Sequence, residues 1–207
     1  MREILLSILV AAIAYLLGCF STGLTVSGAK GVDIRNRGSK NTGASNVLRV
    51  MGLKSGLITF AGDFLKAALA CWIGSLILPG TTFGIARYGM MLAGLFAIIG
   101  HNWPVFYGFK GGKGVACSAA VGFFVDPLWG SAAIVACLAV IALTRFISLG
   151  SMTMLFCYMV LMCIAHWGQW AVCLFTVVLF AMCVWRHRSN IHRLLSGTEN
   201  RIGQKAK

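Results

Sequence analysis

The sequence predicts an all-α integral membrane protein. Of its 207 residues, 58% are hydrophobic and 11% are charged, whereas about 25% charged residues is typical of soluble domains. The mean hydropathy of +0.84 agrees with this composition. A transmembrane helix takes about 20 residues, and connections of roughly 8 residues then leave room for about seven transmembrane helices. We therefore expect a single polytopic membrane domain over residues 1–207 and no soluble domain.

Long apolar runs define the expected helices. They cover residues 4–27, 55–78, 87–107, 115–125, 128–144, 147–166 and 168–185. Pro79, Pro104 and Pro127 lie at or near the ends of these runs, where a missing backbone donor costs least. The fourth run is too short to cross about 30 Å of hydrocarbon at about 1.5 Å per residue. We therefore expect it to form a half-helix.

The basic residues predict the orientation of these helices. Most of them lie in four places: between the first two runs, after the third, after the fifth and after the last. By the positive-inside rule, all four face the cytoplasm, which puts the N-terminus outside and the C-terminus in the cytoplasm. Lys113 and Arg145 share a side only if the chain crosses twice, or dips and returns, between them. The amino end of the half-helix then lies on the cytoplasmic side.

Composition also excludes several function classes. The net charge of +13 comes from 18 Lys and Arg against 5 Asp and Glu, which indicates anionic partners or a role of the bases in topology. Short loops offer no module that reads a nucleic-acid groove, so nucleic acid is excluded. Scattered carboxylates cannot form an acidic metal cluster, and the 8 cysteines lie mostly inside apolar runs with no Cys-x-x-Cys pair. We expect neither a metal nor a cofactor.

The first basic segment, residues 28–54, combines glycines, hydroxyls, amides and arginines. Such a loop can form a backbone nest with cationic walls that suits a phosphate. A flexible basic linker to anionic lipid is the alternative, but the density of Ser and Asn side chains favours the phosphate site. Gly38 and Gly43 have the spacing of a Walker A loop, yet Ala44 occupies the position of its lysine. We therefore do not expect ATP binding.

A second basic segment, residues 101–114, runs directly into the half-helix. Gly111, Gly112 and Gly114 allow the backbone to approach an anion, and Lys113 supplies a charge. The first turn of the following helix adds free N–H donors. An interfacial turn with snorkelling lysines is the alternative. The repeated Gly and Lys residues at a helix start favour a second phosphate site.

Two further features carry polar groups next to apolar helices. The third basic segment, residues 186–199, places His187 and Asn190 on one helical face, although an amphipathic tail would have the same pattern. Asp63 and Lys66 lie three residues apart inside an apolar run. An intramembrane carboxylate is a functional candidate, but we expect these two side chains to pair with each other.

Three motifs taken together resemble those of the bacterial acyl-phosphate:glycerol-3-phosphate acyltransferases, the PlsY type. The motifs are Gly38–Arg49, His101–Gly114 and Arg186–Glu199, and the resemblance spans nearly the whole chain. It implies transfer of a fatty acyl group from acyl phosphate to the 1-hydroxyl of glycerol 3-phosphate, giving lysophosphatidate and phosphate. This is the first step of phospholipid synthesis.

The resemblance also assigns roles to individual residues. It implies catalytic roles for Ser39, Arg49, His187 and Asn190, and a structural role for Glu199. It implies contacts to substrate or phosphate from a larger set: Asn41, Ser45, Gly111, Gly112, Lys113, Gly114 and Ser151. Ser148 and Ser151 resemble a serine-bearing turn in the segment 145–151. Three places depart from the family pattern: Lys40 at a usual glycine, Ser45 at a usual threonine, and the stretch Cys19–Thr22.

The expected chemistry is a direct attack by the glycerol hydroxyl on an acyl group that is already activated, with no acyl-enzyme. No histidine is followed five residues later by aspartate, which excludes the His-x-x-x-x-Asp dyad of many glycerolipid acyltransferases. The proton acceptor is either His187 or a substrate phosphate oxygen. We favour the phosphate, because no carboxylate is evident to orient His187.

The resemblance implies a location and partners. We expect a multi-pass protein of the bacterial plasma (inner) membrane with its active site on the cytoplasmic face. The upstream enzyme that forms acyl phosphate is a possible functional partner. A small multi-span transporter of an anionic phosphorylated solute is the alternative function, since it would share the spans and basic loops. Transporters built from inverted repeats show paired interrupted helices, whereas only one half-helix is expected here.

Overall fold

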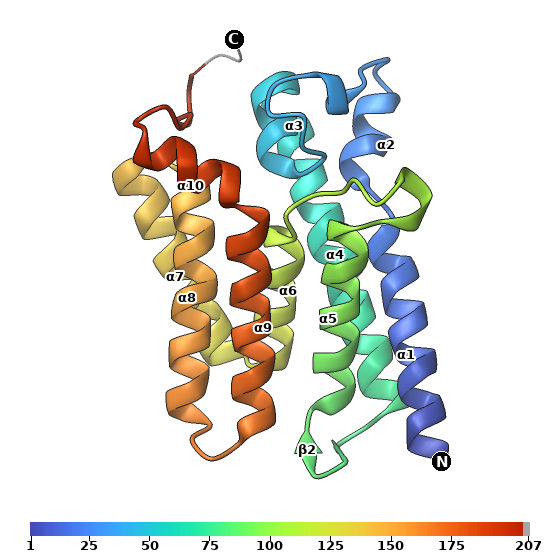
Figure 1. The fold of residues 1–207 in the computed structure, drawn as a ribbon. Helices are drawn as coiled ribbons and strands as arrows, with labels where there is room; N and C mark the ends of the chain where they lie inside the picture. The colour runs from blue at the N-terminus through green and yellow to red at the C-terminus, as the bar shows by residue number, and fades with distance from the viewer. Residues whose placement is uncertain (205–207) are drawn as a thin grey trace. The chain divides into compact units, whose positions relative to one another are not determined.

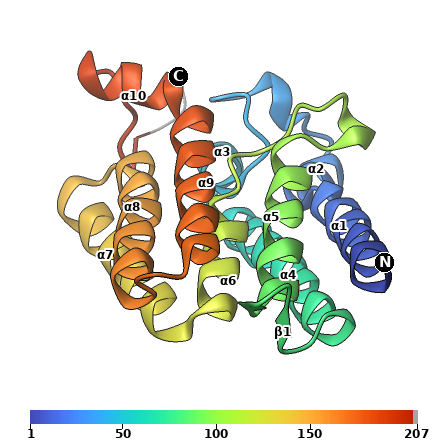
Figure 2. The same ribbon diagram turned by 60° about the horizontal axis from the view of Figure 1, so that its bottom comes forward.

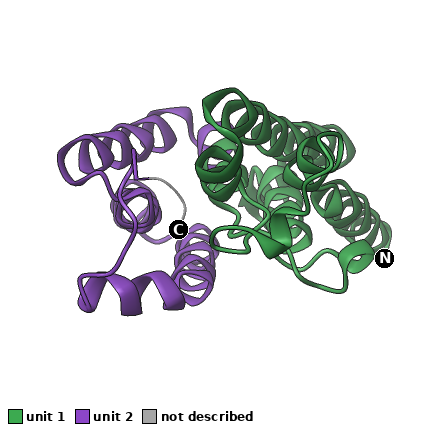
Figure 3. Cartoon of the chain, turned by 90° about the horizontal axis from the view of Figure 1, so that it is seen from above, with its two compact units in different colours: residues 1–121, 205–207 green, residues 122–204 purple. Residues whose placement is uncertain are grey.

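The computed structural model describes residues 1–204, and residues 205–207 lie outside the described part. Apart from one short hairpin, the regular elements of residues 1–204 are all helices (Figure 1). Residues 1–121 and residues 122–204 form two compact units, coloured green and purple in Figure 3. The expected all-α class is thus confirmed except for the hairpin, in which Thr81 pairs with Ala86 and Thr82 with Ile85.

The elements of the first unit belong to its apolar runs and to the loops between them. They are α1 (Arg2–Cys19), α2 (Thr22–Gly28), η1 (Ile34–Asn36), α3 (Ala44–Met51), α4 (Leu53–Ile77), β1 (Thr81–Thr82), β2 (Ile85–Ala86), α5 (Tyr88–Asn102) and η2 (Val105–Tyr107). The short helix α6 (Val115–Val125) follows. The second unit contains α7 (Pro127–Thr144), α8 (Ile147–Ala165), α9 (Trp170–Arg186) and α10 (Arg188–Leu195).

Five helical segments of residues 1–204 are long and apolar enough to cross a membrane. They are Arg2–Gly28, Leu53–Ile77, Tyr88–Tyr107, Pro127–Thr144 and Ile147–Ala165. The pair α9 and α10, bent by 61°, makes a sixth if it is counted as one span. Helix α6 has only 11 residues, as the half-helix prediction requires. The predicted orientation of the termini stays a prediction.

Close helix packing in the first unit depends on glycine. Helices α1, α4 and α5 lie side by side (Figures 1 and 2). A Cβ added at Gly18 would overlap the backbone oxygen of Ala97, and one at Gly100 would overlap that of Tyr15. Small residues let membrane helices approach to backbone contact. This packing fixes α5, whose last turn carries His101 and Asn102 into the second basic segment.

The sequence predicts one continuous helix over the first apolar run, residues 4–27. The structure instead contains two helices there. Helix α1 ends at Cys19, and α2 begins at Thr22 after the N-cap Ser21, whose hydroxyl accepts a hydrogen bond from the backbone N–H of Leu24 at 3.4 Å. The carbonyl oxygen of Phe20, at the break, accepts a hydrogen bond from the ammonium group of Lys66 on α4. A buried lysine therefore uses a main-chain acceptor that the interrupted helix makes available.

Candidate functional site

The first basic loop is organised by the side chain of Asn46, which is 1% exposed. Its Oδ1 accepts a hydrogen bond from the backbone N–H of Ser39 at 2.8 Å. Its Nδ2 lies within hydrogen-bond distance of three carbonyl oxygens, those of Ile34 (3.3 Å), Arg37 (3.0 Å) and Asn41 (2.8 Å). One amide on α3 thus connects residues 34, 37, 39 and 41. The sequence showed Asn46 as part of a polar loop but not this role.

Within residues 34–41, Gly38 and Lys40 adopt left-handed backbone conformations. Gly38 has φ +56°, and a Cβ there would overlap Asn46 Oδ1. Lys40 has φ +59°, a conformation that favours glycine, so its departure from the family pattern places an ordinary residue where glycine fits best. The Lys40 N–H still donates to the carbonyl oxygen of Arg37 at 3.0 Å. The turn is therefore kept with lysine in place.

The predicted residues of the first loop surround this turn. Ser39 is exposed, and Asn41 is half-buried with its Oδ1 accepting from the Gly43 N–H at 2.9 Å. Ser45 is exposed in the first turn of α3. Arg49 is half-buried in the last turn of the same helix. Residues 39–49 thus carry both neutral polar and cationic side chains, the two kinds that commonly bind a phosphate.

The second basic loop packs directly on the end of α5. The Gly112 N–H donates to the His101 carbonyl oxygen at 3.0 Å. A Cβ at Gly111 would overlap that oxygen, and one at Gly112 would overlap the imidazole ring of His101. Gly114 has φ +76° and precedes the first turn of α6. These glycines are therefore required by packing, a reason that the sequence did not reveal.

A buried ionic cluster lies beneath this loop. Asp63 Oδ1 and Lys66 Nζ are 2.9 Å apart, which confirms the predicted pair. The sequence did not predict the third member, His101, whose Nδ1 lies 3.0 Å from Lys66 Nζ and 3.5 Å from Asp63 Oδ1. His101 comes from α5 and the other two from α4, so only the fold brings the three together.

In the second unit, Glu199 connects the two helices α8 and α10. Its Oε1 accepts hydrogen bonds from Ser148 Oγ at 2.8 Å and from Asn190 Nδ2 at 2.6 Å, and its Oε2 accepts from Arg193 Nε at 2.7 Å. Burial opposes ionisation of this carboxyl, but these hydrogen bonds, with the charge of Arg193, hold the pKa of Glu199 below its ordinary value. The structural role of Glu199 that the resemblance implies stays a prediction.

His187 lies at the bend between α9 and α10 and is 2% exposed. Its Nδ1 is 2.9 Å from the carbonyl oxygen of Cys183. Because a carbonyl only accepts, the proton of a neutral ring resides on Nδ1, and Nε2 carries the lone pair. A main-chain oxygen therefore orients the imidazole where the sequence had offered no carboxylate.

The two serines of segment 145–151 have different partners. Ser148 Oγ donates to Glu199 Oε1, as described above. Ser151 is 1% exposed, and its hydroxyl donates to the Ile147 carbonyl oxygen at 2.7 Å, one turn earlier in α8. The Ser151 hydroxyl proton is engaged in this hydrogen bond, so Ser151 Oγ can take part in a further hydrogen bond only as an acceptor. Ser148, which the sequence gave less weight, is the serine in the network with Asn190.

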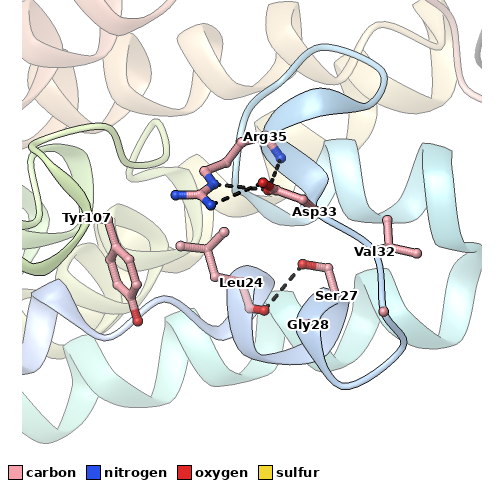
Figure 4. Close-up of a pocket in the computed structure, with 8 residues that line it drawn as sticks. Leu24, Ser27, Gly28, Val32, Asp33, Arg35 and Tyr107 are labelled. Carbon is pink, nitrogen blue, oxygen red and sulfur yellow. Dashed lines mark hydrogen bonds and ion pairs between the residues drawn. The ribbon is translucent and has the colours of Figure 1, made fainter.

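A cavity of about 310 Å³ opens where the first and second basic segments meet (Figure 4). It is lined by Leu24, Ser27, Gly28, Gly31, Val32, Asp33, Arg35 and Tyr107. The guanidinium of Arg35 and the carboxylate of Asp33 are 2.9 Å apart, and their hydrogen bond lowers the pKa of Asp33. The cavity contains none of the predicted site residues, but it shows that residues 24–35 and Tyr107 lie side by side.

The predicted residues divide between the two units. Ser39, Asn41, Ser45, Arg49 and the segment Gly111–Gly114 belong to the first. Ser151, His187, Asn190 and Glu199 belong to the second. Within residues 1–204, no group of three or more His, Cys, Asp or Glu side chains is arranged to hold a metal ion.

Apolar spans and two basic, glycine-bearing loops define a helical integral membrane protein. Residues 8–197 match the family described as Glycerol-3-phosphate acyltransferase. The chain belongs to this family, whose members act as acyltransferases in phospholipid synthesis.

Relatives and solved structures agree with this assignment. Proteins named Glycerol-3-phosphate acyltransferase are 42% identical in Thermoanaerobacter sp. (strain X514), covering 96% of this chain and 97% of that one, and 39% identical in Aquifex aeolicus (strain VF5), covering 91% and 95%. The crystal structure of PlsY (YgiH), an integral membrane glycerol 3-phosphate acyltransferase in its glycerol 3-phosphate form, has a TM-score of 0.86 at 37% identity and covers 95% of this chain and 96% of that one.

Replacing Asn46 tests whether one amide holds the first loop. Asn46→Ala removes the acceptor of the Ser39 N–H and the donor to three carbonyl groups, so we expect a loss of about 1–3 kcal/mol in the free energy of unfolding. Amide hydrogen exchange over residues 34–41 should accelerate. Asn36→Ala is the control, since its exposed side chain contacts only Asp33 at 3.2 Å. Unchanged exchange in Asn46→Ala would contradict this role.

The ionic state of Glu199 makes the stability of the protein depend on pH. Its lowered pKa means that the stabilisation is complete above the ordinary glutamate value of 4.5 and is lost as pH falls through the lower folded-state pKa. We expect Glu199→Gln to lower the free energy of unfolding by about 1.5–3 kcal/mol at neutral pH. The difference should shrink on acidification. Thermal unfolding in detergent measures this, with the exposed Glu3→Gln as control; a difference independent of pH would refute it.

Proposed function

We propose that this protein transfers a fatty acyl group from acyl phosphate to the 1-hydroxyl of glycerol 3-phosphate. The products are lysophosphatidate and inorganic phosphate, and the reaction begins phospholipid synthesis. The observation that carries the proposal is the pair of basic loops in the first unit, in a chain whose family acts on glycerol 3-phosphate. The crystal structures of PlsY, in glycerol 3-phosphate and lysophosphatidic acid forms, support the acceptor and product.

The first unit supplies the phosphate-binding groups. Arg49 and Lys113 contribute the positive charges, and the glycine-rich backbone of residues 111–114 lets an anion approach the start of α6. Ser39, Asn41 and Ser45 add neutral hydrogen-bonding groups. Phosphate binding of this kind combines cationic side chains with backbone donors at a helix start. Charge on the departing phosphate is stabilised by the same groups.

The chemical step is a single displacement. The glycerol hydroxyl oxygen attacks the acyl carbonyl carbon and forms the new ester bond, while the bond from that carbon to the phosphate oxygen breaks. Inorganic phosphate leaves with the bonding electrons. The hydroxyl proton passes to a phosphate oxygen of a substrate, and His187, Asn190 and Ser151 position the reacting groups. The group that His187 Nδ1 contacts is a neutral main-chain carbonyl and not a carboxylate as in a catalytic triad, and we assign the base to the substrate.

The charge distribution and the family together support a location. We place the protein in the bacterial plasma (inner) membrane, with the segments 28–54, 101–114, 145–151 and 186–199 on the cytoplasmic face, since they carry most of the bases. The acyl-phosphate donor is then delivered by an upstream enzyme that forms acyl phosphate. An apolar acyl chain remains in the lipid while its phosphate reaches the aqueous side.

One assay tests the proposed reaction directly. Purified protein in detergent micelles should release inorganic phosphate from palmitoyl phosphate only when glycerol 3-phosphate is present, because acyl transfer needs both substrates. A transporter of a phosphorylated solute would not cleave the donor. Absence of release with both substrates present would defeat the proposal.

Replacing His187 separates the two candidate bases. If a substrate phosphate accepts the proton, His187→Gln should keep measurable turnover, with a loss smaller than about 10⁴-fold, the upper range for acid-base catalysis. Steady-state phosphate release gives the rate. His192→Gln, an exposed histidine on α10, serves as control and should match the parent. A loss beyond that range in His187→Gln would assign the base to the imidazole.

A further inference from the structure

The cluster of Asp63, Lys66 and His101 is unusual because it is buried within helices of membrane-spanning length. The side chains are 2%, 7% and 5% exposed, respectively. The Lys66 ammonium group lies 2.9 Å from Asp63 Oδ1 and 3.0 Å from His101 Nδ1, and it donates to the carbonyl oxygen of Phe20. The ammonium group therefore has polar partners on three segments of the chain.

Stability alone does not account for a buried ion pair. Removing two charges from water costs more than their attraction often returns, and apolar side chains of similar volume are frequently as stabilising. What hydrogen bonds add is direction, because each fixes both a distance and an angle. A role that requires a precise position explains the cluster better than a role in holding helices together, which the glycine contacts of α1, α4 and α5 already serve.

The cluster contacts the glycine loop through His101. The His101 carbonyl oxygen accepts the Gly112 N–H, and a Cβ added at Gly112 would overlap the imidazole ring. Beyond the loop, the Cys117 thiol in the first turn of α6 donates to the backbone carbonyl oxygen of Asp63 at 3.2 Å. The position of His101 is therefore coupled to the backbone of Gly111 and Gly112.

We propose that Asp63, Lys66 and His101 form a positioning cluster that sets the backbone of residues 111–114 for binding the phosphorylated acceptor. The cluster itself does not touch substrate. The Lys66 ammonium holds the His101 ring, and the ring and carbonyl of His101 support Gly111 and Gly112 from below. This inference rests on the proposed function, in which the glycine loop binds glycerol 3-phosphate.

The test uses the full-length double variant Asp63→Asn with Lys66→Met. Both charges disappear together, so no lone charge is left buried, and the thermal unfolding midpoint should stay near that of the parent. We expect the KM for glycerol 3-phosphate to rise about 10–100-fold, the range for lost outer-shell support or misplacement of a binding group. The KM for palmitoyl phosphate and the kcat should stay within about twofold of the parent.

Thr59→Val is the matched control. Thr59 is also buried in α4, and its hydroxyl donates to the Ser55 carbonyl oxygen at 2.9 Å, one turn away from the cluster. This variant should keep the parent KM for both substrates. Gly112→Ala adds a second readout: combined with the double variant, its effect on the KM for glycerol 3-phosphate should be less than additive, because both act on one segment.

The outcomes separate this inference from the proposed function. If the parent releases no phosphate with both substrates, the proposed function fails. If the parent is active and the folded double variant keeps the parent KM for glycerol 3-phosphate, or changes both KM values equally, the positioning cluster is refuted. If the double variant does not fold, His101→Asn replaces it, since its amide oxygen still accepts from Lys66 while the ring beneath Gly112 is gone. The same rise in KM is then expected, and its absence refutes the cluster.

Discussion

Polar groups in a chain this apolar must find partners within the protein, and this requirement shapes the three basic segments. Each segment depends on one buried polar side chain. Asn46 holds the first loop, His101 supports the second and Glu199 collects the donors of the third. None of the three is on the exposed surface of its loop. The exposed residues of these segments are therefore held in position by buried polar side chains.

The helices were predictable from the sequence because long apolar runs leave little choice of secondary structure. The short helix α6 was predictable because the apolar run over residues 115–125 is only 11 residues long. The breaks were not predictable, since the run over residues 4–27 is apolar on both sides of Phe20 and Ser21. The hairpin between α4 and α5 is similarly too short to leave a pattern of alternating residues.

The candidate site was predictable only where its signals are local. Asp63 and Lys66 are neighbours on one helix, so their pairing followed from spacing. His101 joins them from 35 residues beyond Lys66, and Ser148 meets Glu199 across 51 residues, and no local pattern encodes such pairs. The sequence shows the glycines of the second loop, but it does not show that they are needed to avoid overlap with His101. A glycine that avoids a ring and a glycine that admits an anion look alike in a sequence.

The break at Phe20 has a consequence for how freely this part of the chain can vary. Lys66 takes a main-chain oxygen there, and every amino acid carries one. The identity of residue 20 is therefore unconstrained by this contact, while the path of the backbone is constrained by it. The amino acids of the stretch Cys19–Thr22 can therefore differ from the family pattern while the main-chain carbonyl oxygen of residue 20 still accepts the hydrogen bond from Lys66. Substitution tolerance and structural importance are thus uncoupled at this position.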